Sequence, residues 1–308
     1  MTPQQERAGL LFAALCVLNG ALVPAVAKLT TDRGAPLFVA TVTTLFAGTF
    51  AALVLGIRGE LRVLLRGVAG PRLAFVGTLG TGVAFLMFFA GASRSSAIET
   101  VLCLQIEPAY SLLAAWLVLG HRPTRRRVAA ISILLVGIAL AVGGRGFIPS
   151  SGAWLLLVTP LCWQLSHLVV LRSLVGISPL VLTGARYVYG SAVLALCWLL
   201  TGGIGNLPAA STLPTLVPLL AFQGVVLSYV GTLLWYQAVT RLDLARSTAI
   251  VVPSIPLLSL LASFLLLGEV PTAHQWAGLL LTAGGVLTFV TAPDARPMGT
   301  LVAEVVQR

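Results

Sequence analysis

The sequence predicts an all-α membrane protein with ten transmembrane helices, arranged as two inverted five-helix repeats. Three observations support this fold class. The composition is 58% hydrophobic and 9% charged, with a mean hydropathy of +1.00, so a soluble domain of 308 residues would lack the polar side chains that cover a surface. Ten apolar runs are long enough to cross about 30 Å of hydrocarbon as helices. One segment of seventeen residues also occurs twice.

The duplicated segment defines the two repeats. PAYSLLAAWLVLGHRPT, at 108–124, returns 148 residues later as PLLSLLASFLLLGEVPT, at 256–272, with ten of seventeen positions identical. Each half holds five apolar runs, and an odd number of crossings places the second copy upside down relative to the first. We therefore expect a first repeat over 1–145, an inverted second repeat over 146–295 and a cytoplasmic tail over 296–308.

The ten spans follow one another with mostly short connections. Their expected ranges are 8–29, 36–57, 73–92, 97–119, 128–143, 152–171, 179–200, 215–239, 246–267 and 273–292. The linker between the repeats, GGRGFIPSSG, is rich in residues that form turns.

The basic residues predict the orientation of these spans. With the N-terminus inside, fourteen Lys and Arg residues fall on the cytoplasmic side and four on the outer side. This bias places both termini in the cytoplasm, and we expect the chain in a bacterial inner membrane. The net charge of +10 is then a topology signal, and it favours contact with anionic lipid headgroups over nucleic acid.

Motifs for enzymatic chemistry are missing from the sequence. It contains no HExxH, GxSxG or P-loop pattern, and its four cysteines show no CxxC spacing. We therefore expect no catalytic residue, no metal site and no cofactor.

The end of the second repeat resembles a known family. The pattern LGEVPT is followed by Trp276, Gly278 and Gly285, and the seventh span carries Arg186 shortly after Pro179. These features are similar to those of the EamA family of the drug/metabolite transporter superfamily, and the resemblance covers nearly the whole chain. It implies a secondary carrier, most often an exporter of amino acids and related metabolites, with a central cavity between the halves.

Two positions in the first half depart from the family pattern. His121 stands where the repeat-ending Glu is expected, and Thr43 lies at about the position of an expected arginine in the second span. The two halves are therefore expected to differ in function.

Glu107 is the sharpest candidate for a binding residue. It lies at the centre of the fourth span and is followed by Pro108. A carboxylate at that depth costs about 2.5–3.5 kcal/mol, so it should face a polar cavity or be protonated and bonded to Gln105, Tyr110 or a neighbouring helix. Pro108 cannot donate a hydrogen bond to the carbonyl of Leu104, which opens the helix locally.

The ninth span carries a similar signal in Pro253, Ser254 and Pro256. Two prolines in one turn predict a kinked or unwound helix. Interrupted helices at matching places in two inverted repeats are typical of a midplane binding region, although a fixed kink needed only for packing is the alternative.

Arg186 is the one basic residue well inside a span. It could bind a substrate carboxylate through two hydrogen bonds. It also lies about 10 Å from the cytoplasmic interface at about 1.5 Å per residue, within reach of snorkelling, and we favour that structural role.

Aromatic and polar residues near span centres complete the candidate site. Trp163 and His167 are four residues apart and share a helix face. Phe85, Trp163 and Tyr229 could stack on an apolar or aromatic side chain of a ligand. Asn19 lies near the middle of the first span.

Two further carboxylates fall near span ends. Glu99 is expected to reach the interface or Arg94. Glu269 is expected to serve turn formation and capping beside Gly268 and Pro271.

These observations predict a secondary exporter of small amphipathic metabolites, most specifically amino acids with aromatic or large apolar side chains. The mechanism is alternating access around a midplane cavity. A nucleotide-sugar, sugar-phosphate or drug carrier of the same superfamily and a passive channel-like facilitator are the alternatives. The expected partners are the substrate, the bilayer and a proton as candidate coupling ion, in a monomer or weak dimer.

Overall fold

The computed structural model describes residues 3–118, 120, 122–143, 150–174, 176–242 and 244–292. Within these ranges all regular secondary structure is helical. The expected tail at 296–308 and the departure at His121 lie outside the described residues.

The first half contains α1 to α7. Its elements are α1 Pro3–Thr31, α2 Pro36–Ile57, η1 Leu61–Leu65, α3 Ala69–Gly77, η2 Thr78–Val83, α4 Ala84–Ala92, α5 Ala97–Leu104, α6 Glu107–Leu117 and α7 Arg125–Gly143.

The second half contains α8 to α13. Its elements are α8 Ser151–Ser173, α9 Pro179–Leu200, η3 Gly203–Asn206, α10 Leu213–Phe222, η4 Gln223–Val230, α11 Gly231–Leu242, α12 Leu244–Leu267 and α13 Ala273–Val290. In both halves a π-helical segment, η2 or η4, joins two α-helices into one apolar rod.

Nine rods in the described chain are long and apolar enough to cross a membrane. The expected tenth, at 97–119, consists of two shorter helices, α5 and α6, separated by Gln105 and Ile106. The amides of these two residues donate to carbonyls only three residues earlier, at 3.3 Å each. Pro108, which has no N–H, follows directly. The local opening predicted at Pro108 is therefore present, and the structure shows nine long spans and one interrupted segment in place of ten long spans.

Of the kink or unwinding expected in the ninth span, the unwinding is absent. α12 is a continuous helix that contains both Pro253 and Pro256. Ser254 Oγ donates a hydrogen bond of 2.7 Å to the carbonyl of Ile250, and α12 packs closely against α1. Pro253 and Pro256 have no N–H group, so this turn lacks two backbone donors. The Ser254 hydrogen bond and the packing against α1 are found where these donors are missing.

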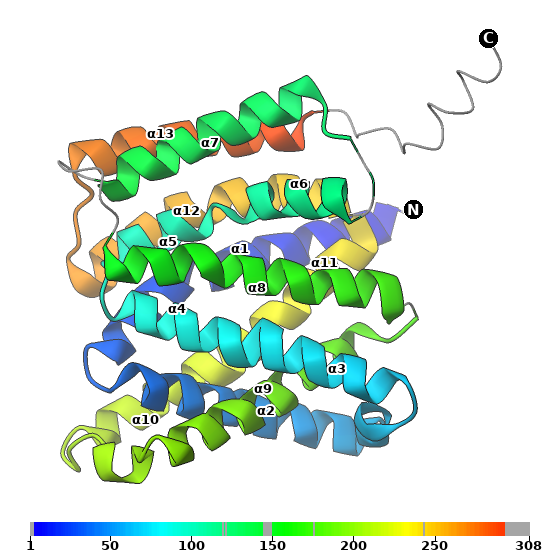
Figure 1. Ribbon diagram of the computed structural model, residues 1–308, viewed down its shortest axis with the longest axis vertical. Helices are drawn as coiled ribbons and strands as arrows, with labels where there is room; N and C mark the ends of the chain where they lie inside the picture. Colours follow the sequence, from blue (N-terminus) through cyan, green and yellow to red (C-terminus); the bar gives the residue numbers. More distant parts are fainter. Residues whose placement is uncertain are drawn as a thin grey trace.

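The rods lie side by side in layers (Figure 1). α7 packs against α13, α2 against α9, α1 against α11 and α12, and α8 against the α3–η2–α4 rod and against α5 and α6. The first turn of α1 and the last turn of α13 lie on the same side of the bundle. We call this side the near end and the opposite side the far end.

α7 and α13 contact each other through equivalent residues of the two repeats. A Cβ on Gly137 would lie 2.7 Å from the amide nitrogen of Thr282 and 2.9 Å from the carbonyl oxygen of Gly278. A Cβ on Gly285 would lie 2.8 Å from the amide nitrogen of Leu134 and 2.9 Å from the carbonyl oxygen of Ala130. At the 148-residue offset, Gly285 corresponds to Gly137, Thr282 to Leu134 and Gly278 to Ala130. Close approach of the two backbones therefore depends on both glycines.

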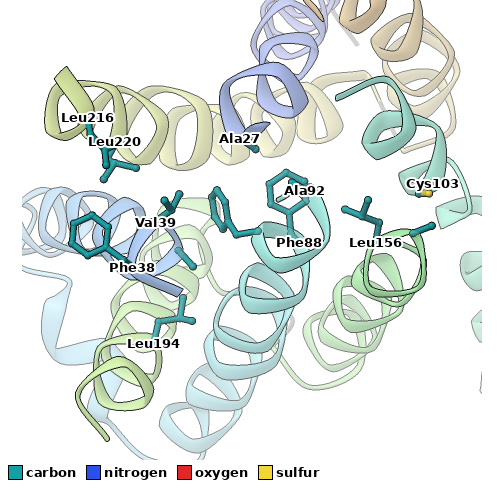
Figure 2. Close-up of a cluster of buried hydrophobic side chains, with 13 residues drawn as sticks. Ala27, Phe38, Val39, Phe88, Ala92, Cys103, Leu156, Leu194, Leu216 and Leu220 are labelled. Carbon is teal, nitrogen blue, oxygen red and sulfur yellow. The ribbon is translucent and has the colours of Figure 1, made fainter. Parts of the chain in front are cut away.

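An apolar cluster closes the far end of the bundle. Figure 2 shows its side chains converging from α1, α2, α4, α5, α8, α9 and α10. The labelled members are Ala27, Phe38, Val39, Phe88, Ala92, Cys103, Leu156, Leu194, Leu216 and Leu220. All are buried, so the far end has a packed core where the helix ends meet.

Candidate functional site

The interruption between α5 and α6 positions Glu107. Glu107 is the first residue of α6, in the middle of the expected fourth span. Gln164 of α8 donates from Nε2 to Glu107 Oε1 over 2.9 Å. The partner thus comes from a neighbouring helix, and the expected alternatives Gln105 and Tyr110 do not make this bond.

Arg186 of α9 binds the π-helical segment η2 of the first half. Its guanidinium donates from Nη2 to the carbonyl of Gly80 over 2.9 Å and from Nε to Thr81 Oγ1 over 3.5 Å. Only 8% of Arg186 is exposed. The expected snorkelling is therefore wrong, because the side chain bonds to η2 inside the bundle.

Tyr187 makes the matching contact to the other π-helical segment. Its hydroxyl donates to the carbonyl of Ser228 in η4 over 2.8 Å and lies 2.8 Å from Thr232 Oγ1. A π-helical turn departs from the regular α-helical bonding pattern and frequently marks a functional position. Two consecutive residues of α9, Arg186 and Tyr187, thus hold one such segment from each half.

Asn19 also binds η4. Its Nδ2 donates to the carbonyl of Val226 over 2.8 Å, and a Cβ on Gly231 would collide with its side-chain oxygen. The structure places Asn19 at the α1–η4 contact, and none of its described hydrogen bonds reaches Glu107.

Phe85 and Tyr229 belong to one aromatic cluster that is joined through Tyr187. The ring centroid of Tyr187 lies 6.2 Å from that of Phe85 and 6.2 Å from that of Tyr229. Tyr229 is only 2% exposed, so its ring packs against protein in this conformation and does not line open space. Phe85 is partly exposed.

Trp163 lies apart from this cluster. It makes none of the ring contacts found among the described residues. Its indole Nε1 is buried and has no hydrogen-bond partner within the described part of the chain. On the same helix, Gln164 and His167 are partly exposed, as is Trp163 itself. The α8 segment 163–167 therefore carries a ring with a free N–H donor and an imidazole near Gln164, the residue that binds Glu107.

The surroundings of Glu107 differ from those at the far end. Glu107, Trp163 and His167 are partly exposed in mid-span, while the apolar cluster of Figure 2 is buried at the far end. Two pockets are lined by neither Glu107, Trp163 nor His167. One of about 460 Å³ at the far end is lined by Phe38, Trp198 and Asn206, among others. One of about 190 Å³ lies beside the α5–α6 interruption. The midplane cavity remains a prediction.

Sequence reasoning missed Gln164 and Tyr187. Gln164 is an amide in an otherwise apolar run, which is a signal that could have been used. Tyr187 carried no such signal, because a tyrosine beside the candidate Arg186 is equally compatible with packing.

Comparison with known proteins gives concordant matches. The model of the EamA-like transporter family matches residues 7–143 and 150–291. The "Probable terminal-alkyne amino-acid exporter" of Streptantibioticus cattleyicolor is 28% identical over 219 residues, which cover 70% of this chain and 72% of that protein. The "Uncharacterized transporter YyaM" of Bacillus subtilis is 25% identical over 212 residues, which cover 66% and 67%.

A solved crystal structure matches almost the entire chain. The alignment covers 98% of this chain and 100% of the other, with a TM-score of 0.65 and 17% identity. At this level of identity the match shows a shared fold.

Proposed function

The chain belongs to the EamA-like transporter family, and from this membership we propose that it exports amino acids with aromatic or large apolar side chains. The family and the names of the relatives indicate a transporter rather than an enzyme. One relative is named as an amino-acid exporter, which supports the substrate class.

The Glu107–Gln164 contact is the observation that carries this proposal. Gln164 fixes one carboxylate oxygen of Glu107 at 2.9 Å, and the other, which no hydrogen bond of the described residues occupies, can accept from a substrate ammonium group. The ring of Trp163, one residue before Gln164, can stack on an apolar side chain. A zwitterion with a large side chain suits this balance of one carboxylate and few other charges.

Sugar phosphates and nucleotide sugars suit the site less well. Multiply charged anions need several basic groups around the binding position. Within the described spans Arg186 is the one basic residue in a central position, and its guanidinium is already bonded to Gly80 and Thr81.

We further propose that the two halves are inverted repeats and that the near end faces the cytoplasm. The reciprocal contacts of Gly137 and Gly285 support a two-fold relation between the halves, and a π-helical segment in each half supports the repeat. The charge bias of the sequence supports the orientation. In this arrangement α5 and α6 together form the tenth crossing, and Glu107 is loaded from the cytoplasm.

Counterflow in proteoliposomes tests the substrate and separates a carrier from a channel. We expect internal unlabelled phenylalanine or tryptophan to accelerate entry of the labelled amino acid. Trp163→Ala should reduce this exchange about fivefold, since stacking contributes about 1 kcal/mol. Trp154→Ala is the matched control, because Trp154 lies on the same helix but is 58% exposed. Exchange of threonine or a sugar phosphate without any aromatic or branched amino acid would contradict the proposal.

A further inference from the structure

Glu269 binds the first turn of a helix from the other half of the chain. It follows Gly268, whose φ of 67° turns the chain at the end of α12. Glu269 Oε1 accepts a hydrogen bond from the amide of Ala97 over 3.1 Å, and Oε2 accepts one from the amide of Ile98 over 3.2 Å. Both amides belong to the first turn of α5, where N–H groups have no partner within the helix and a negative charge is favourable. Glu269 therefore caps a helix, but that helix belongs to the other half of the chain and not to its own turn.

Further hydrogen bonds extend this contact to α8. Ser96 Oγ accepts from the amide of Glu99 over 3.0 Å. Glu99 Oε1 accepts from Ser150 Oγ over 2.9 Å, so Glu99 binds the start of α8 and not Arg94. Ser150 Oγ in turn accepts from the amide of Ala153 over 3.0 Å. We call Ser96, Glu99, Ser150 and Glu269 the far-end capping network.

The capping network lies beside apolar contacts that close the same end. Ala97 is fully buried and packs with Ala25 of α1 and Ala262 of α12. Any opening of the far end that separates α5 from α12 must break these contacts and leave the Glu269 carboxylate and two amides to be solvated. The contact therefore stabilises the conformation in which the far end is closed.

We propose that Glu269 is a positioning residue that holds the far end closed and keeps the Glu107 site accessible from the near end. This inference rests on the proposed alternating-access function. Glu269 corresponds to His121 in the first repeat, at the 148-residue offset. A neutral imidazole has one acceptor nitrogen and cannot accept two amide hydrogen bonds as a carboxylate does. The sequence thus provides the bidentate acceptor at one end of the carrier only.

Cysteine accessibility tests this role without requiring a substrate. In a background with the four native cysteines replaced by alanine, Ala92→Cys places a thiol within the buried cluster of Figure 2. A second reporter, Ser111→Cys, places one on a partly exposed position one turn after Glu107. Each is labelled with a membrane-impermeant maleimide added from the side that its position faces.

Glu269→Gln preserves the shape of the side chain and removes its charge. We expect the labelling rate at Ala92→Cys to rise about tenfold and that at Ser111→Cys to fall, because charge-assisted hydrogen bonds are about twice as strong as neutral ones. Asp32→Asn is the control. It also removes a far-end carboxylate, but Asp32 pairs with Lys28 at 2.7 Å and is half exposed.

A second substitution keeps the inference testable if Glu269→Gln folds poorly. Glu269→Asp keeps the charge but shortens the side chain by one methylene group, so the carboxylate no longer reaches both amides of α5. We expect a smaller shift in the same direction.

The outcomes separate gating from general loosening and from failure of the proposed function. Unchanged labelling at both reporters, or a rise at both, would overturn the role of Glu269. Absence of amino-acid exchange in the wild-type protein, with the labelling shifts intact, would instead contradict the proposed substrate.

Discussion

The segments around Pro108 and Pro256 are copies of each other, yet they adopt different structures. The first contains an interruption between α5 and α6 directly before Pro108. The second is the continuous helix α12, although it holds one proline more. Proline content alone therefore does not decide whether a helix in this protein is interrupted.

The residues before the two prolines explain what each segment contributes. Glu107 precedes Pro108 and bonds to Gln164 of α8. Ile255 precedes Pro256, and its Cδ1 lies 2.9 Å from where a Cβ on Gly20 of α1 would be. When Asn19 is aligned with Trp163, Gly20 aligns with Gln164. The same contact is polar in one half and apolar in the other, so one copy forms the candidate site and its counterpart packs the bundle.

The largest effect is expected from removing the ionisable group that distinguishes the two copies. Glu107→Gln should insert and fold normally but lower amino-acid exchange about tenfold to a hundredfold, because a charge-assisted hydrogen bond to a substrate ammonium contributes about 1.5–3 kcal/mol. The measurement is counterflow in proteoliposomes, with Asp32→Asn as a control at the far end. If the variant exchanges amino acids at the wild-type rate across the pH range, Glu107 is a structural polar group without a role in transport.

Substitution of the paired glycines tests whether the two halves are packed alike. Gly137→Ala and Gly285→Ala each place a Cβ less than 3.0 Å from backbone atoms of the facing helix. Each should destabilise the protein by about 1–3 kcal/mol, measured as a drop in Tm in detergent.

Gly284→Ala is the matched control for this pair, since a Cβ at Gly284 would meet no atom within 4 Å. Gly284 is the direct neighbour of Gly285 on α13, so the two substitutions differ only in the side of the helix that receives the Cβ. Clearly different effects of Gly137→Ala and Gly285→Ala would contradict reciprocal packing of α7 and α13.

A smaller effect is expected at the two π-helical segments. Tyr187→Phe removes the hydroxyl that donates to the carbonyl of Ser228 and should cost about 1–2 kcal/mol, because a buried acceptor loses its donor. Tyr189→Phe is the control on the same helix. Its hydroxyl donates to Leu64 near the end of the bundle, so this substitution should leave exchange unchanged, while Tyr187→Phe should reduce it. Equal amino-acid exchange in both variants would show that the contact between Tyr187 and η4 does not affect transport.

The sequence was informative where a local property decided the structure. The interruption near Pro108 could be predicted because a missing N–H acts within one turn. The continuity of α12 through Pro253 and Pro256 could not be predicted from the sequence. It accompanies packing against α1, which is more than two hundred residues away in the sequence. The same holds for Gln164, whose partner Glu107 is 57 residues distant. The capping of α5 by Glu269 spans 172 residues and is likewise invisible to pattern reasoning.

The smallest effect concerns the apolar counterpart of the candidate site. Gly20→Ala brings a Cβ to 2.9 Å from Ile255 Cδ1, and that methyl group is the flexible end of a side chain, which can rotate away. We expect a loss of less than about 1 kcal/mol in stability and unchanged amino-acid exchange, measured by thermal unfolding and counterflow on the same preparation. Gly56→Ala, whose added Cβ would meet no atom within 4 Å, is the control. A strong fall in exchange with intact stability would show that the α1–α12 contact takes part in transport, and the contrast between a polar site in one half and simple packing in the other would then fail.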